Sequence, residues 1–376
     1  MRLTAQYAPA FIIFIWQNTT YVEFIKPAGI VRKFYIFRRM KMKKIVLVLG
    51  ITVLLFATFN PTSASAQSNV ASYYVRANGN DSNNGTTEAR PFKTLAKAVE
   101  AASKTNVKKI TVIGKLDGQT AIKDSGSDEI FITGKADASD NDKAVITTSS
   151  TERVSTIEIT GNSNIRLENI TIRRESAFNI VSVQGSNTVL TLGRDAIIFG
   201  NGTEIQNYTG AGAGIFLIEG KVIMRDNATV TNCYANMGGG VALGEGASMI
   251  MQDNAVISNN KAAIAGGGVF VQNGNLELRN NAVIKGNIAL RDNFERGGGG
   301  IYSVDSSVAL YDNSIVTGNS APHGGGIYLR FSQIKIDDGE SNGRSVYESR
   351  HVSGNTATRS LHGQGAITHN IFHMDM

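Results

Sequence analysis

Short runs of alternating apolar and polar residues recur through the second half of the chain. One motif joins a run of glycines to an apolar strand, and its last glycine falls at 214, 240, 268, 300, 326 and, weakly, 365. A second motif starts at 222, 249, 276 and 308 with the strings VIMRDNATV, MIMQDNAVI, LELRNNAVI and VALYDNSIV. Most repeats are 26 to 32 residues long. Such a period predicts a solenoid in which each repeat forms one coil.

Strand parity predicts which side chains of each coil point inward. Alternate side chains of a strand share a face, and stacking of coils would bury each inward position as a continuous stripe. The Gly runs and the Asp-Asn pairs supply turns, where positive φ is required or tolerated. The predicted inward residues are Leu190, Leu192, Ala196, Ile198, Val222, Met224, Ala228, Val230, Met249, Met251, Ala255, Ile257, Leu276, Leu278, Ala282, Ile284, Val308, Leu310, Ser314 and Val316.

Less regular versions of the pattern occupy the first half of the chain. Apolar runs at 110–114, 130–134, 144–148, 157–161 and 165–174 indicate earlier coils. Two or three short strands per coil, with no helix between them, predict an all-β parallel β-helix of about ten coils. Before the coils, Lys93 to Ser103 places Leu95, Ala96, Val99 and Ala102 on one face, which predicts a short N-terminal cap helix.

The N-terminal region has the order of a secretory signal. A basic stretch at 40–44 precedes an apolar run at 45–57 and the small residues Ala64-Ser-Ala66, which predicts cleavage near Ala66-Gln67. The apolar run is too short for a comfortable membrane span, so no transmembrane domain is expected after cleavage. Residues 1–39 lack this organisation, and we interpret them as an upstream extension.

Composition and charge narrow the classes of protein. The chain has 40 Gly, 5 Pro and a single Cys, which favours a repetitive β protein and excludes an internal disulfide framework. The net charge is +6, but residues 1–66 contribute +8, so the remainder carries −2. The basic charge therefore belongs to the N-terminal region, and no nucleic-acid partner is expected.

These observations predict a linear organisation. We expect an extension at 1–39, a signal peptide at 40–66, a lead-in segment with the cap helix at 67–108, β-helix repeats at 109–367 and an uncapped tail at 368–376. Val352 follows Val316 by 36 residues, so about ten residues near 340–349 should loop out.

Two parts of the sequence carry a family resemblance. The segment YYVRANGNDSNNGTTEARPFKTLAKAVEAA at 73–102 resembles the start of secreted bacterial right-handed parallel β-helix proteins of the pectate-lyase-like superfamily. The GGGIY coils resemble repeats of bacterial surface proteins, including the polymorphic outer-membrane type. The resemblance spans 73–367 and implies a right-handed β-helix that is secreted or placed at the cell surface or in the periplasm. Its members include polysaccharide lyases, glycosidases and adhesins, so the fold does not settle the function.

A catalytic site is one expectation that the resemblance raises. A lyase of this superfamily would hold Ca²⁺ with carboxylates and use Arg or Lys to remove the proton α to a uronate carboxylate. The weak candidates are Asp337, Asp338, Glu340, Arg330 and Lys335, for which a solvated acidic turn is the competing interpretation. A ladder of Asp226, Asp253, Asn280, Asp312 and Asp338 fits turn-capping hydrogen bonds better than a metal cage. No metal site is predicted, and Cys233 is expected to be a buried thiol.

An aromatic row suggests a binding face instead. Phe216, Ala242, Phe270, Tyr302 and Tyr328 share one register with outward parity. Exposed aromatic rings would suit sugar rings or a protein partner. The competing interpretation is that these rings pack under another segment.

The sequence therefore predicts a secreted or cell-surface monomer that binds a glycan or a surface partner without catalysis, as an adhesin does. The alternative is a calcium-dependent polysaccharide lyase or another carbohydrate-active enzyme. A truncated remnant without activity is a third possibility. No cofactor is expected apart from Ca²⁺ in the lyase case.

Overall fold

The computed structural model describes residues 72–136, 139, 142–150, 152–174, 178–202, 210–291, 296–337, 350–358 and 370–374. It also gives the backbone of three strands near the N-terminus. The chain forms two compact units, Met1–Asn69 and Val70–Met376. In the first unit, β1 (Ala10–Trp16) pairs antiparallel with β2 (Thr19–Ile25), which pairs with β3 (Phe37–Arg38). The predicted signal peptide at 40–66 lies outside the described residues.

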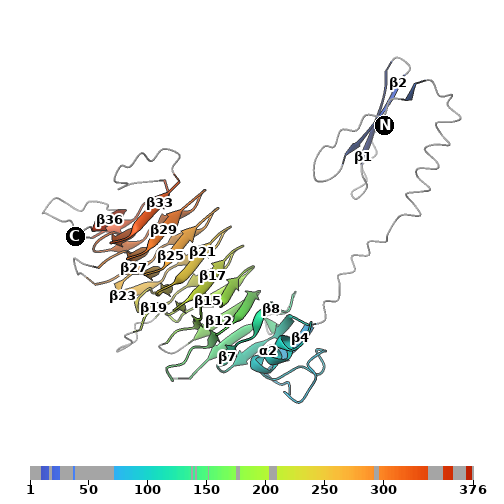
Figure 1. The fold of residues 1–376 in the computed structure, drawn as a ribbon, viewed down its shortest axis with the longest axis horizontal. Coiled ribbons are helices and arrows are strands. Elements are labelled where there is room, and N and C mark those ends of the chain that lie inside the picture. The colour runs from blue at the N-terminus through green and yellow to red at the C-terminus, as the bar shows by residue number, and fades with distance from the viewer. Residues whose placement is uncertain are drawn as a thin grey trace. The chain divides into compact units, whose positions relative to one another are not determined.

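In the second unit, the described strands form four sheets in which neighbouring strands are parallel, as Figure 1 shows. We number these sheets 1 to 4, and the strands of each are given below. The chain passes through sheets 1, 2 and 3 in turn, and in the later coils through sheet 4, before it returns to sheet 1 one coil further on. Parallel pairing between successive coils satisfies the backbone hydrogen bonds of every interior strand. The predicted parallel β-helix is confirmed, and the described part of sheet 2 holds ten strands.

The strands of the four sheets have the following bounds. Sheet 1 contains β7 (Thr120–Lys123), β10 (Ile157–Thr160), β13 (Val181–Gln184), β16 (Ile215–Leu217), β20 (Val241–Leu243), β24 (Val269–Gln272), β28 (Ile301–Val304), β32 (Ile327–Arg330) and β36 (Ile371–Met374). Sheet 2 contains β4 (Ser72–Arg76), β5 (Lys109–Ile113), β8 (Gly126–Gly134), β11 (Ser163–Glu168), β14 (Val189–Leu192), β17 (Gly220–Met224), β21 (Ala247–Met251), β25 (Asn275–Leu278), β29 (Ser307–Leu310) and β33 (Gln333–Ile336). Sheet 3 contains β6 (Lys115–Asp117), β9 (Val145–Thr148), β12 (Ile170–Arg174), β15 (Ala196–Phe199), β18 (Thr229–Thr231), β22 (Val256–Ser258), β26 (Val283–Lys285), β30 (Ile315–Thr317) and β34 (Val352–Ser353). Sheet 4 contains β19 (Tyr234–Met237), β23 (Lys261–Ala265), β27 (Ile288–Ala289), β31 (Ser320–Ala321) and β35 (Thr356–Ala357).

The core lies inside the coils and matches the predicted inward stripes. Every residue of the predicted inward set is buried. The earlier apolar runs also form strands, from β5 to β12. A stripe of this kind stabilises the fold only because each coil covers the apolar face of the next.

The predicted cap helix is present as α2 (Leu95–Ser103), which begins at a well-formed cap. The Thr94 hydroxyl accepts a hydrogen bond from the Lys97 amide at 3.2 Å, as an N-cap residue does. The helix buries Leu95, Ala98, Val99 and Ala102. The prediction of Ala96 on the buried face is wrong, because at 100° per residue Ala98 lies nearer to Leu95 and Ala102.

The last described strand corrects the assignment of the C-terminal repeat. In β36, Ile371 pairs with Ile327 of β32 and extends sheet 1. Asn370, rather than a glycine, therefore occupies the position of Gly326 in the preceding coil, and the β-helix continues into the segment expected as a tail. Val352 pairs with Val316, as predicted, while the expected loop at 340–349 lies outside the described residues.

A buried ladder of asparagines closes the turn between sheets 3 and 4. The Asn260 side-chain oxygen accepts from the Cys233 amide, and the Asn287 oxygen accepts from both nitrogens of Asn260 at 2.9 and 3.0 Å. Asn319 and Asn355 repeat the pattern in the next two coils. Each amide group also donates to a carbonyl of the preceding coil, so the buried polar atoms of the ladder are satisfied.

Candidate functional site

The predicted aromatic row exists in the expected register on sheet 1. Phe270, Tyr302 and Tyr328 pair in successive strands, with ring centroids 5.8 and 5.1 Å apart. Phe372 of β36 continues the stack at 4.7 Å from Tyr328. Phe216 stands in the same register two coils earlier, with Ala242 between it and Phe270.

These rings do not form the exposed face that we expected. Tyr302 is 4% exposed and Tyr328 is fully buried. Sheet 4 packs against the row through Met237, Ile264 and Ala265, which form a second apolar cluster outside the main core. The prediction of an exposed aromatic platform is therefore wrong, because the sequence did not reveal a fourth sheet. A ligand role for Phe216, Phe270, Tyr302 and Tyr328 stays a prediction, now without the open surface on which it rested.

The candidate lyase residues are only partly described. Asp337 is exposed, and its backbone carbonyl accepts a hydrogen bond from Arg350 at 2.8 Å. Asp338 and Glu340 lie outside the described residues. Arg330 and Lys335 lie against the rings of Phe331 and Tyr311, at 5.4 and 5.3 Å from the centroids. Among the described residues, no group of three His, Cys, Asp or Glu side chains could hold a metal ion.

The aspartate ladder caps turns, as the sequence predicted. Asp226, Asp253, Asn280 and Asp312 all have positive φ, between 52° and 58°. The Asp253 carboxylate accepts from the Asp226 amide at 3.1 Å and from the Asn280 side chain at 2.8 Å, while Asp312 accepts from the Asn280 amide. These oxygens are engaged with the neighbouring coil, which agrees with a structural role.

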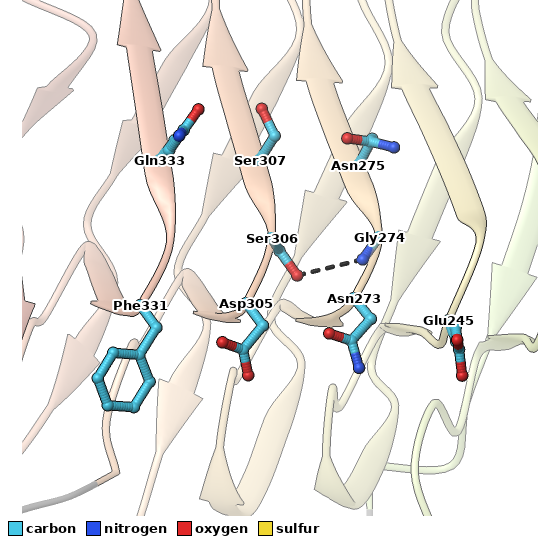
Figure 2. Close-up of a pocket in the computed structure, with 9 residues that line it drawn as sticks. All are labelled: Glu245, Asn273, Gly274, Asn275, Asp305, Ser306, Ser307, Phe331 and Gln333. Atoms are coloured by element: carbon cyan, nitrogen blue, oxygen red, sulfur yellow. Dashed lines mark hydrogen bonds between the residues drawn. The ribbon is translucent and has the colours of Figure 1, made fainter.

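An open groove lies at the turn from sheet 1 to sheet 2. It has a volume of about 650 Å³ and crosses four coils. Figure 2 shows one row of side chains at the turn, Glu245, Asn273, Asp305 and Phe331, and a second row at the first residue of three strands, Asn275, Ser307 and Gln333. Each row repeats at about 4.8 Å, the spacing between neighbouring strands.

Polar side chains in this groove have free hydrogen-bonding capacity. Glu245, Asn273, Asn275, Asp305 and Gln333 are all exposed. Within the described part of the chain, their side chains form no hydrogen bond or ion pair with protein atoms. Two carboxylates and three amides therefore face the groove with donors and acceptors available to a ligand.

A network of serines holds the groove floor in place. Ser306 accepts from the Gly274 amide at 3.2 Å, the contact drawn in Figure 2. Ser332 is buried and accepts from the Ser306 amide at 3.2 Å and from the Ser303 hydroxyl at 3.0 Å. Because these bonds link neighbouring coils, they fix the spacing between successive members of each row.

Phe331 is the unusual member of the groove. Its side chain is 45% exposed and its φ is +49°. Asn273 and Asp305 occupy the same turn position at φ values of 52° and 48°. Asn and Asp tolerate this left-handed conformation, whereas a bulky residue there is an outlier. An exposed ring held in an unfavourable backbone conformation points to a role beyond packing.

The sequence analysis missed this groove, although a signal was present. Asn273, Asp305 and Phe331 each directly follow a strand of sheet 1, namely β24, β28 and β32. The change from Asn and Asp to Phe at that position was visible in the alignment of repeats. The more prominent aromatic residues of the sequence lie inside the strands, where Phe270, Tyr302 and Tyr328 are buried.

Cys233 is a buried thiol, as predicted. Burial raises its pKa from 9.0 to about 12, because a thiolate would lose its hydration. A thiol in this state is a poor nucleophile, so Cys233 is not a candidate catalytic residue.

The fold defines a class of protein, and one comparison agrees with it. Residues 179–357, just under half of the chain, match the family model described as the right handed beta helix region. The protein is a right-handed parallel β-helix protein, and its earlier coils extend the same architecture beyond the matched residues. No match was found among curated proteins or solved structures. Within the described residues, no helix is long and apolar enough to span a membrane.

Proposed function

We propose that this protein is a non-catalytic glycan-binding protein, secreted or held at the cell surface, and that the groove between sheets 1 and 2 is its binding site. The observation that carries the proposal is the exposed ring of Phe331 at the end of a row of uncommitted amide and carboxylate groups. The predicted signal peptide supports the location.

The chemistry of the groove suits a sugar chain. A pyranose ring presents an apolar face that packs on an aromatic ring and an edge of hydroxyl groups that hydrogen-bond to amides and carboxylates. The groove offers both within a few coils, with Phe331 beside Asp305 and Gln333. Because it is open and crosses four coils, it can hold part of a long polymer without enclosing the chain ends.

The fixed spacing of the groove favours a linear ligand that lies along the stack of coils. Equivalent side chains repeat every ~4.8 Å along that direction. The serine network fixes the floor before any ligand arrives, which lowers the entropy cost of binding. The exposed ring, the amides and the carboxylates of the groove are all available for contact with a sugar chain, so binding is the function that this geometry supports best.

The proposal is tested by removing the ring. Affinity electrophoresis of the full chain through a panel of neutral, basic and acidic polysaccharides should show retention by at least one of them. Phe331→Ala should weaken that retention by about tenfold, the value of one aromatic contact. Phe199→Ala is the matched control, because Phe199 is 41% exposed but lies on sheet 3.

Two results would contradict the proposal. Retention that is equal in Phe331→Ala and the unsubstituted protein would remove the groove as the site. Shortened products with an unsaturated end, detected by mass spectrometry only when Ca²⁺ is present, would establish a lyase instead of a binding protein.

A further inference from the structure

We propose that the groove selects glycans with free amino groups and discriminates against uronate polymers. This inference rests on the proposed glycan-binding function and adds the chemical class of the ligand. It concerns the charges that line the groove rather than its ring.

The formal charges of the nine lining residues have one sign. Glu245 and Asp305 are carboxylic acids, and the other seven residues are neutral. Both carboxylates are exposed and form no ion pair within the described residues, so neither charge is neutralised by a protein cation. The Arg330 guanidinium lies 5.4 Å from the centroid of the Phe331 ring, and Figure 2 shows Phe331 and Glu245 at opposite ends of the row.

The positions of the two carboxylates along the stack of coils strengthen the inference. Glu245 and Asp305 stand in one row two coils apart, so about 10 Å separates them. A linear polymer lying along this row brings more than one of its sugars past a carboxylate. Ammonium groups on such a polymer would meet two fixed negative charges, whereas uronate carboxylates would be repelled by both.

Asn273 lies between the two carboxylates and shows that the charge of Asp305 is not needed for the turn. It occupies the same turn position as Asp305 in the preceding coil, with a similar φ. An amide therefore satisfies the backbone there. The Asp305 carboxylate is therefore free to serve a ligand, and Asp305→Asn is a substitution that the fold already accepts one coil away.

The test compares three tetrasaccharides that carry positive, neutral and negative charge. Isothermal titration of the full chain at about pH 5.5, where Asp and Glu are ionised, uses a glucosamine tetramer, its fully N-acetylated counterpart and a galacturonate tetramer. We expect the free-amine tetramer to bind about fivefold more tightly than the acetylated one, because exposed carboxylate–ammonium pairs are individually weak. The preference should fade as salt is raised toward about 1 M.

The variant Glu245→Gln with Asp305→Asn should lose the amine preference while keeping affinity for the acetylated tetramer. The matched control, Asp117→Asn with Glu158→Gln, removes two exposed negative charges from early coils and should keep the preference. Comparing the two separates a local effect from the change in net charge.

The outcomes that contradict the inference can be told apart from those that contradict the proposed function. Equal affinity for the amine and acetylated tetramers, or a preference for galacturonate, would overturn the charge selection and leave glycan binding intact, provided Phe331→Ala still weakens binding. A preference that survives in the Glu245→Gln, Asp305→Asn variant would place the amine elsewhere. Absence of binding to every tetramer and polysaccharide would overturn the inference and the proposed function together.

Discussion

Two turns of each later coil contain similar polar residues, but these residues are buried at one turn and exposed at the other. At the turn between sheets 3 and 4, Asn260, Asn287 and Asn319 are buried and bond to one another in sequence. At the turn between sheets 1 and 2, Asn273 and Asp305 stand in a comparable row but are exposed. Their side chains bond to no other described protein group.

Whether the side-chain donors and acceptors are used within the protein distinguishes a polar repeat that stabilises the fold from one that is available to a ligand. Every coil must satisfy its buried polar atoms, so a repeated Asn that meets this need is explained by folding alone. At the groove, the left-handed turn explains why Asn or Asp occupies the position, but it leaves the donors and acceptors of these side chains unused and available to a ligand. We expect the buried Asn ladder to stabilise the fold and the exposed row at the groove to bind a ligand. The tests of this contrast follow from the largest expected effect to the smallest.

The thiol at the start of the buried ladder should be almost inert. The Cys233 amide donates to Asn260, and burial raises the thiol pKa from 9.0 to about 12. At a given pH below both values, the native protein then has about a thousandfold less thiolate than the unfolded chain. Labelling with a thiol reagent at about pH 8 should be slower than in denaturant by at least that factor. Rapid labelling of the native protein would show that this end of the ladder is open.

The same shift gives a pH dependence of stability with a definite sign. The unfolded chain loses the thiol proton near pH 9.0, whereas the folded chain keeps it up to about pH 12. The contribution of Cys233 is therefore fully present below pH 9.0 and is lost as pH rises toward about 12. Denaturant unfolding of Cys233→Ala should show less of this alkaline loss.

Removing one rung of the buried ladder should destabilise the protein strongly. Asn287→Ala removes two bonds that its oxygen accepts and two that its nitrogen donates. It leaves buried partners of the neighbouring coils unsatisfied, at a cost of about 3 kcal/mol or more in the free energy of unfolding. Urea unfolding followed by circular dichroism measures the change.

Asn281→Ala is the matched control for that experiment, since Asn281 lies in the same coil and is exposed. Its side chain donates one long bond of 3.3 Å to Asn254 and accepts one of 3.4 Å from Asn313. Its effect should stay within about 0.5 kcal/mol. Similar losses in the two variants would mean that burial of the ladder does not distinguish the two kinds of Asn.

At the groove, the backbone of Phe331 allows a smaller but more specific test. Phe331→Asn and Phe331→Ala both remove the ring and its contact with Arg330. Only Asn is comfortable at a φ of +49°, so the Asn variant should be more stable by about 1 kcal/mol. Both variants should weaken glycan retention by about tenfold. Equal stability would show that the turn carries no strain, and retained binding in either variant would separate the ring from the site.

The sequence was sufficient to predict the fold because its signals are repeated and local. Inward residues such as Leu276 and Leu278 recur at a fixed offset in every coil, so each repeat confirms the others. The cap helix was found from its apolar face, with one error at Ala96. The length of the repeats and the alternation of inward and outward side chains together are compatible with few other architectures.

The candidate site could not be located in the same way. Three of the five described strands of sheet 4, β27, β31 and β35, have only two residues each, too few for an alternation that would reveal them. Without that sheet, Tyr302 and Tyr328 appeared to be outward and free. The groove depends on which polar atoms remain unpaired after folding, and that property follows from contacts between coils rather than from the residue types themselves.

The smallest expected change in stability provides the sharpest contrast between the two rows. Asn275 is exposed at the first position of β25, and its side chain bonds to no described protein atom. Asn275→Ala should therefore alter the free energy of unfolding by no more than about 0.5 kcal/mol. It should still weaken glycan binding by about fivefold, because a hydrogen bond to the ligand is worth about 1 kcal/mol. Asn281→Ala, equally harmless to stability, should leave binding unchanged. If Asn275→Ala instead destabilised the fold and left binding unchanged, Asn275 would have the same structural role as the asparagines of the buried ladder. The distinction between the buried ladder and the exposed groove residues would then be wrong, because Asn275 is the residue for which it predicts the clearest difference.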